Sequence, residues 1–305
     1  MIFQRTLKNS VKATGVGVHS GEKACLTIRP ALPNTGIVFR RVDLDVPVDI
    51  PAQSEYISST DLCTTLSKDH ASVSTVEHLM SAFCGLGIDN AYVDLSQSEV
   101  PIMDGSAGPF VFLIQSAGID IQKTPKFFVR IKKALKVNDG DKWIEVKPYH
   151  GFRASFDIEF DHPIFGEDNQ RVVFDAAQMS YERELSRART FGFVSDYEYL
   201  LKNNLAKGAS LDNAIALDKF KVVNDGGLRY VDECVKHKLL DLLGDLYLLG
   251  YPMIGAVHAS CSGHKLNSLL LKALKSRQDC WELVSDQDEK TLPIRFFSSP
   301  IISEG

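Results

Sequence analysis

Apolar and polar positions alternate along several short segments of the chain, a pattern typical of β-strands with one buried face. These segments are also rich in β-branched and aromatic residues. The predicted strands cover residues 23–30, 36–42, 91–96, 127–137, 143–149 and 152–160. The glycines of 14-TGVGVHSG-21 precede the first of them. Because no helical pattern follows these glycines directly, we expect them to shape a hairpin rather than to bind phosphate.

Four other segments repeat apolar residues three and four positions apart, which is the spacing of one helix face. The predicted helices cover residues 75–87, 109–118, 233–250 and 265–278. Pro109 favours a helix start, and Asp104-Gly105 just before it is typical of a turn. Residues 119–126 fit neither pattern and are predicted to be a linker.

The order of these elements predicts two domains of similar design. Each half of the chain has most of its strands first and its main helix late, which favours an α+β fold over a parallel α/β sheet. We therefore predict domains at residues 1–126 and 127–305. Residues 76–93 and 235–257 also echo each other, since both read Val-x-His, a helix, Leu-Gly and a β-rich strand.

Leucines surround almost the whole helix predicted at residues 233–250, which is typical of a buried helix. His237, Asp241 and Asp245 follow one another at intervals of four residues, so their side chains share one face of it. A buried row of ionisable groups is costly unless the groups are paired or bind a metal.

His237 and Asp241 have a spacing that lets one helix supply two ligands to a metal ion. A hydrogen-bonded core histidine or a simple ion pair has the same pattern, so the alternative stays open. His78, at the equivalent place in the echo, would complete the three protein ligands that a catalytic zinc site requires. Two imidazoles and a carboxylate suit Zn²⁺, and they also accept Fe²⁺ or Co²⁺.

Glu77 fits two roles. Ser74-x-x-Glu77 matches a capping box, in which the glutamate bonds to the first amide of the helix. Beside a metal ligand, the same carboxylate would act as a general base toward water.

His264 and Thr190 are further candidates for the site. His264 follows a glycine turn and is either a loop histidine or a protonated group that serves the reaction. The second role needs a carboxylate to keep the imidazole charged, and Asp245 is the candidate. Thr190 would donate to an oxyanion or be an ordinary turn hydroxyl.

Composition narrows the function without defining it. The chain has 305 residues, of which 44% are hydrophobic and 24% charged, with a net charge of −5. No long Lys/Arg run occurs, so nucleic acid is not a predicted partner. No signal peptide and no apolar run of transmembrane length is found, and the cysteines form no C-x-x-C pair. We expect a cytoplasmic protein with reduced thiols, whose oligomeric state the sequence leaves open.

Six motifs in a fixed order resemble one family. They are VEHLMSAFCGLGIDN, PIMDGSAGPF, SRARTFGF, GASLDNAI, HKLLDLLGDL and SGHKLN. In these motifs the chain is similar to the UDP-3-O-acyl-N-acetylglucosamine deacetylases, zinc enzymes that commit Gram-negative bacteria to lipid A and lipopolysaccharide synthesis. The resemblance begins at the opening QRTLK and extends to about residue 297.

The resemblance implies two related α+β domains, with helices packed between two outer β-sheets and an insertion in each domain. The expected reaction hydrolyses the N-acetyl group of a UDP-3-O-(hydroxyacyl)-N-acetylglucosamine, giving acetate and a free amine. The following roles are implied: metal ligands His78, His237 and Asp241; general base Glu77; acid or electrostatic stabiliser His264, oriented by Asp245; oxyanion donor Thr190; and Lys238, which helps to hold the substrate.

The resemblance also implies where the substrate lies. Lys142, Phe160 and Lys238 are candidates for the uridine-diphosphate end. The acyl chain would follow a passage built from residues 194–217, with Phe191 and Phe193 at its mouth. Ala209 departs from the family, which often has glycine there, so the preferred acyl length is not predicted.

Overall fold

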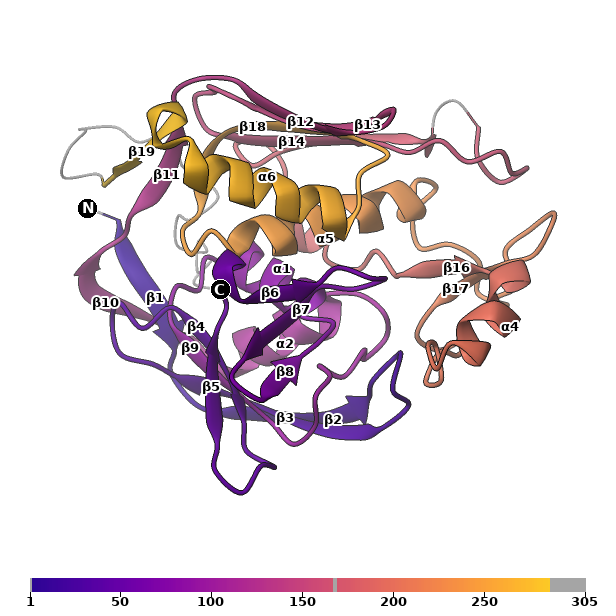
Figure 1. Ribbon diagram of the computed structural model, residues 1–305, viewed down its shortest axis with the longest axis horizontal. Coiled ribbons are helices and arrows are strands. Elements are labelled where there is room, and N and C mark those ends of the chain that lie inside the picture. Colours follow the sequence, from indigo (N-terminus) through magenta and orange to yellow (C-terminus); the bar gives the residue numbers. More distant parts are fainter. Residues whose placement is uncertain (1, 167–168, 286–305) are drawn as a thin grey trace, which may run out of the picture.

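In the computed structural model, which describes residues 2–166 and 169–285, helices lie between two outer β-sheets (Figure 1). The lower sheet of the view has the order β2-β3-β9-β4-β5. Its strands are β2 (Val11–Val16), β3 (Lys23–Pro30), β4 (Ile37–Arg41), β5 (Val48–Pro51) and β9 (Ala91–Leu95). The central strand β9 is antiparallel to β3 and parallel to β4.

The upper sheet repeats this arrangement around β18 (Met253–Ser260). β18 is antiparallel to β13 and parallel to β14, and β12 and β15 pair with these two on their outer sides. The bounds are β12 (Leu135–Asp139), β13 (Lys142–Lys147), β14 (Phe152–Asp157) and β15 (Arg171–Asp175). β11 (Phe128–Ile131) and β19 (Trp281–Val284) continue the sheet beside the start of β18. The shared strand order agrees with the internal echo in the sequence.

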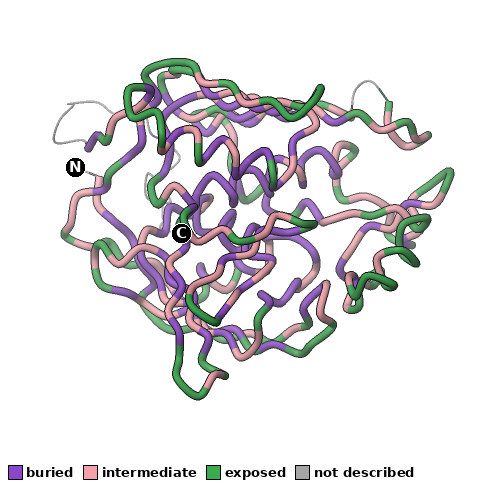
Figure 2. The backbone as a smooth tube through the Cα atoms, in the orientation of Figure 1, coloured by how far each residue is buried: buried purple, intermediate pink, exposed green. Residues whose placement is uncertain are grey.

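The helices between the sheets form the core of the molecule (Figure 2). They are α1 (Glu77–Leu86), α2 (Gly108–Ala117), α5 (Glu233–Tyr247) and α6 (His264–Ser276). Every residue of α5 except Lys238 is buried, as the leucine-rich pattern predicts.

α1 and α5 cross at a glycine. A Cβ atom added to Gly244 of α5 would lie 2.0 Å from the backbone oxygen of Glu77 in α1. The helices can approach this closely because residue 244 has no side chain. The contact sets the first turn of α1, which carries Glu77 and His78, against the middle of α5.

Smaller elements cover the sides of the core. They are β1 (Phe3–Leu7), η1 (Ser54–Tyr56), β6 (Ile57–Ser59), β7 (Thr65–Lys68), β8 (Ala71–Val73), β10 (Ile119–Pro125), α3 (Tyr181–Glu184) and η3 (Gln278–Cys280). β16 (Phe191–Phe193), α4 (Val194–Lys202) and β17 (Ile215–Leu217) project to one side (Figure 1), and no residue of α4 is buried.

The predicted α+β class is confirmed, as are the four main helices and the hairpin at the first glycines, which joins β2 to β3. The predicted linker at 119–126 is wrong, because most of it forms β10 and pairs with β1. The single strand predicted at 127–137 is two strands, interrupted where Lys132 and Lys133 donate to the carbonyl of Cys280. The domain division near residue 126 stays a prediction, and residues 286–305 of the second predicted domain lie outside the described residues.

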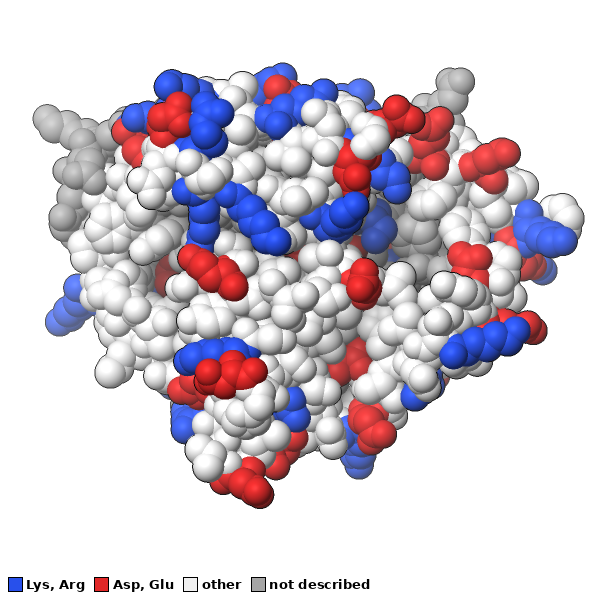
Figure 3. Space-filling view, in the orientation of Figure 1, with Lys and Arg blue, Asp and Glu red and all other residues white. Residues whose placement is uncertain are grey.

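Charges on the visible face are mixed: Lys and Arg side chains are interspersed with Asp and Glu (Figure 3). Within residues 2–166 and 169–285, no helix has both the length and the apolar character needed to cross a membrane.

The α1–α5 crossing can be tested with Gly244→Ala. The added methyl group meets backbone rather than a movable side chain, so we expect a loss of about 1–3 kcal/mol in the free energy of unfolding. Gly226→Ala is the control, because a Cβ there meets no atom within 4 Å. Denaturant unfolding measures both variants, and a Gly244→Ala protein as stable as the wild type would contradict the proposed contact.

Candidate metal centre

Two imidazoles and one carboxylate converge where α1 meets α5. His78, His237 and Asp241 each offer one ligand atom within 4.8 Å of the others, and all three residues are buried. Nε2 of His237 lies 3.3 Å from Oδ1 of Asp241, and Nε2 of His78 lies 3.4 Å from the same oxygen. The structure thus brings together the three residues that the sequence nominates as ligands.

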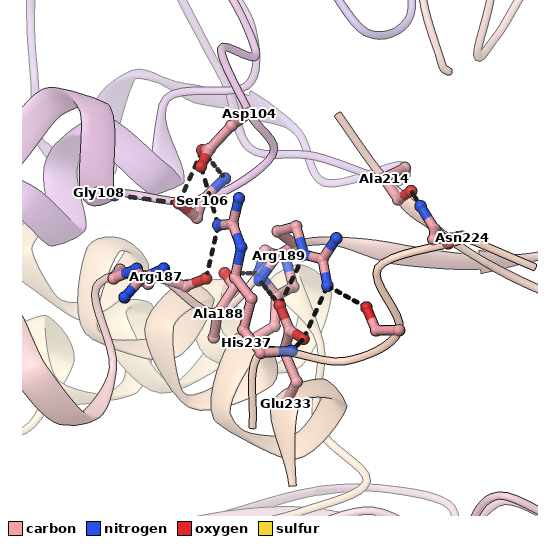
Figure 4. Close-up of polar contacts among 12 residues, drawn as sticks. Asp104, Ser106, Gly108, Arg187, Ala188, Arg189, Ala214, Asn224, Glu233 and His237 are labelled. Atoms are coloured by element: carbon pink, nitrogen blue, oxygen red, sulfur yellow. Dashed lines mark hydrogen bonds and ion pairs between the residues drawn. The ribbon is translucent and has the colours of Figure 1, made fainter. Parts of the chain in front are cut away.

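The hydrogen-bond partner of Nδ1 shows which ring nitrogen of His237 carries the proton. Nδ1 of His237 lies 3.0 Å from the carbonyl oxygen of Ala188, and a carbonyl only accepts, so Nδ1 carries the hydrogen (Figure 4). Burial lowers the pKa of His237 to about 3, although Asp241 acts in the opposite direction. Nε2 therefore presents a lone pair to the carboxylate at neutral pH.

This arrangement fits a cation. Oδ1 of Asp241, which Nε2 of both histidines faces, is buried without a hydrogen-bond partner among the described residues. A buried carboxylate oxygen with no hydrogen bond is costly, and a divalent ion held between it and the two imidazoles would remove that cost. Two imidazoles and a carboxylate form a donor set that accepts a divalent transition-metal ion. Lys238 balances the second carboxylate oxygen, since its Nζ lies 3.1 Å from Oδ2 of Asp241.

Glu77 lies beside this group and does not cap its helix. α1 has Val76 at its N-cap with no side-chain capping bond, and the Ser74 hydroxyl donates instead to the carbonyl of Ser98. The capping-box alternative is therefore wrong. One carboxylate oxygen of Glu77 accepts from the amide of Thr64 at 3.1 Å, and burial raises the pKa of Glu77.

His264 is held by a buried carboxylate. Its Nδ1 donates to Oδ2 of Asp245 at 2.8 Å, while Asn267 donates to the same oxygen and Thr64 to Oδ1. Burial alone would lower the pKa of His264, but the charges of Asp245 and Glu77 outweigh it and raise the pKa to about 9. Nε2 of the charged ring then lies 3.8 Å from Oε1 of Glu77.

A cavity of about 490 Å³ opens onto these groups. Its polar lining includes Glu77, His78, Thr190, His237, Asp241 and His264. Its apolar lining includes Phe191, Phe193, Val194, Leu200, Ala209 and Ile215. Of the predicted catalytic residues, only Asp245 is not part of the lining, and the others share one cavity with the predicted passage.

Of the other residues predicted to bind the substrate, some line the cavity or pack beside it, and one does not. Phe160 packs against Phe191 and Phe193, with ring centroids 5.8 and 5.5 Å apart. Lys238 lines the cavity, whereas Lys142 is exposed at the start of β13 and is not part of the lining.

Three contributors were missed by the sequence reasoning. Thr64 connects Glu77, Asp245 and His264, but a lone threonine in a loop carries no pattern that marks it. His19 lines the cavity and belongs to the glycine hairpin, whose motif indicates a turn and gives no sign of a role for the imidazole. The carbonyl of Ala188 acts through backbone, which no side-chain motif can reveal.

Comparisons with known proteins agree on one family. The family model for UDP-3-O-acyl N-acetylglycosamine deacetylase matches residues 4–276. The chain is 59% identical over 296 residues to a UDP-3-O-acyl-N-acetylglucosamine deacetylase of Coxiella burnetii (strain RSA 493 / Nine Mile phase I), covering 97% of this chain and 98% of that protein. Proteins of the same name from Methylococcus capsulatus and Pseudoalteromonas atlantica are 58% and 55% identical. These alignments cover 97% and 99% of this chain, and 97% and 100% of the respective relatives.

Asp245→Asn tests the origin of the charge on His264. Burial lowers the pKa of His264, and without the carboxylate less negative charge opposes this effect. We therefore expect the pKa to fall from about 9 by about 1–3 pH units. Because the folded-state pKa lies above the ordinary 6.5, the charged ring stabilises the fold below about pH 6.5, and this contribution is lost as the pH rises through about 9.

NMR titration of the imidazole in metal-free protein measures the shift. Asp139→Asn is the control, since Asp139 pairs with the exposed Lys265 in the same first turn of α6. An Asp245→Asn protein with an unchanged His264 pKa would show that another group holds the charge.

Proposed function

The chain belongs to the UDP-3-O-acyl-N-acetylglucosamine deacetylase family, and from that premise we propose a metal-assisted hydrolysis centred on His78, His237 and Asp241. The reaction removes the N-acetyl group from UDP-3-O-(hydroxyacyl)-N-acetylglucosamine, and it releases acetate and the free amine as the committed step of lipid A biosynthesis. The observation that carries the proposal is the convergence of three ligand atoms within 4.8 Å on the cavity that Glu77 and His264 also line.

We propose Zn²⁺ as the ion, with Fe²⁺ and Co²⁺ as alternatives that the same donors accept. When bound, such an ion supplies Lewis acidity, which polarises the acetyl carbonyl and acidifies water. His78, His237 and Asp241 would hold it, and the unpartnered Oδ1 of Asp241, which both imidazoles face, supports this assignment within the described chain.

Glu77 is the proposed general base. Its carboxylate accepts a proton as water attacks the acetyl carbon, and the Thr64 amide fixes one oxygen so that the other faces His264. Burial raises the pKa of Glu77, which makes the carboxylate a stronger base than one in water.

His264 is the proposed acid. Attack converts the carbonyl to a tetrahedral oxyanion, toward which we assign the Thr190 hydroxyl as donor. Cleavage of the C–N bond requires a proton on the departing nitrogen, because an amide anion is a very poor leaving group. A pKa of about 9 keeps His264 charged at neutral pH and able to deliver that proton, while Asp245 holds the ring.

The cavity suits an acylated sugar nucleotide. We propose that the acyl chain lies along the apolar lining between Phe193 and Ile215, and that Lys238 holds the sugar near the reacting amide. Lys142 and Phe160 are proposed for the uridine-diphosphate end, where a cation suits phosphate and a ring suits uracil or sugar.

A cytoplasmic setting is part of the proposal. All six cysteines are free thiols, as expected in a reducing compartment.

Glu77→Gln tests the general base. Glutamine can still accept from the Thr64 amide through its carbonyl oxygen, but it cannot take a proton, so we expect kcat to fall by about 10²–10⁴-fold. Acetate release measures the rate, and metal content and melting temperature show whether the variant is folded and loaded. A loaded variant with wild-type activity would exclude Glu77 as the base.

Substrates of graded acyl length test the passage. Each methylene that the apolar lining buries contributes about 0.8 kcal/mol, so we expect kcat/KM to fall up to about fourfold for each methylene removed. Full turnover of the N-acetylated sugar nucleotide without its acyl chain would instead favour a deacetylase for a different sugar.

A further inference from the structure

A buried ion pair lies behind the metal centre, between Arg189 and Glu233 (Figure 4). Glu233 is the first residue of α5 and has no exposed surface. Its Oε1 accepts from the backbone amide of Arg189 at 3.0 Å and from Nε at 2.9 Å, while Oε2 accepts from Nη2 at 3.1 Å. The amide of Arg229 and the carbonyl of Gly227 complete the set of partners.

The pair is one helical turn from a proposed ligand. Glu233 and His237 stand four residues apart on α5, so their side chains share one face of the helix. Glu233 binds the amide of Arg189, and His237 donates to the carbonyl of Ala188. These two groups belong to the same peptide unit, and α5 therefore holds that unit at both of its polar atoms.

The next residue of the segment is Thr190. Its amide donates to the carbonyl of Gly105 at 2.8 Å, and its carbonyl accepts from the amide of Ile215 at the same distance. The backbone at Gly105 is tightly packed and has little room to move, because a Cβ atom on Gly105 would lie 2.0 Å from the backbone oxygen of Asn213. Any shift of Arg189 would thus reach the Ala188 carbonyl on one side and Thr190 on the other.

Because burying an ion pair is costly, we infer that this pair serves to position neighbouring groups and not to stabilise the fold. Removing two charges from water costs about as much as their attraction returns, so a buried pair adds little net stability. A bidentate guanidinium–carboxylate contact, however, fixes both distance and plane. The orientation of a metal-binding imidazole is set by the group that its second nitrogen meets, and here that group is the Ala188 carbonyl.

We propose that Arg189 and Glu233 are positioning residues for the metal centre. By fixing the peptide between residues 188 and 189, the pair keeps the Ala188 carbonyl under Nδ1 of His237 and leaves Nε2 aimed at the ion. The inference rests on the proposed function, because it assumes that His237 is a ligand. It adds two residues that act on the ion without touching it.

The test uses Co²⁺ as the probe with full-length protein stripped of metal. The dissociation constant comes from competition with a chelator, and the visible absorption of bound Co²⁺ reports the ligand geometry. The variants are Glu233→Gln and Arg189→Lys. The first keeps the shape of the side chain and removes its charge, and the second keeps the charge but removes the planar guanidinium group that makes two parallel hydrogen bonds. Loss of an outer partner of a metal-bound histidine weakens binding by about 10–100-fold, and we expect a change of that order in both.

Asp89→Asn is the matched control. Asp89 also accepts from a buried cation, Lys126, but it lies just beyond the other end of α1 from His78. We expect this variant to lose stability while its Co²⁺ affinity and absorption remain those of the wild type. If Glu233→Gln does not fold, Arg189→Lys decides the question.

Wild-type Co²⁺ affinity and absorption in the Glu233 and Arg189 variants, with only a lower melting temperature, would overturn the positioning role and leave the proposed function intact. Wild-type protein that binds Co²⁺ no better than His237→Ala would overturn both.

Discussion

The site depends on one close helix crossing. Gly244 lets the backbone of α5 approach that of α1 at Glu77, and no residue with a side chain could stand there without moving one helix. The first turn of α1 therefore meets the middle of α5, where His78 joins His237 and Asp241. A catalytic ion requires ligands held in a fixed geometry, and two rigid helices in van der Waals contact provide this better than loops.

The surroundings of the α1–α5 crossing are apolar, so each charged side chain buried there depends on its polar partners. Buried charges are tolerated only where hydrogen bonds and opposite charges replace water. Asp245 meets this demand with three donors, one of which is charged His264, and Glu233 meets it with Arg189. Among the described residues, four buried side-chain atoms lack a hydrogen-bond partner: Oδ1 of Asp241, Nδ1 of His78, Nδ1 of His19 and Oδ1 of Asp49. Of these, Oδ1 of Asp241 is the atom that both ring Nε2 atoms face, so an unmet electrostatic demand lies where a cation would fit.

Much of this could be predicted from the sequence, because periodicity places side chains within one helix. The row on α5 and the burial of that helix followed from spacing, whereas the role of His78 depended on the echo and on family resemblance. The contacts made by Thr64 and the Ala188 carbonyl could not be predicted, since they join segments far apart in the chain. For the same reason the pattern of residues 119–126 predicts a linker and not a strand, since β10 forms by pairing with β1, which lies far away in the sequence. The apparent capping box failed because Glu77 bonds to Thr64, a partner that local sequence does not contain.

Metal analysis combined with an acetate-release assay shows whether this chain is a metal-dependent hydrolase. We expect about one divalent ion per chain in the purified protein, loss of ion and activity together on chelation, and recovery of both when Zn²⁺ is returned. We also expect that Asp241→Asn, folded but lacking one ligand charge, retains far less metal after the same treatment. Undiminished acetate release from protein shown to be metal-free would contradict a role for the ion in the reaction.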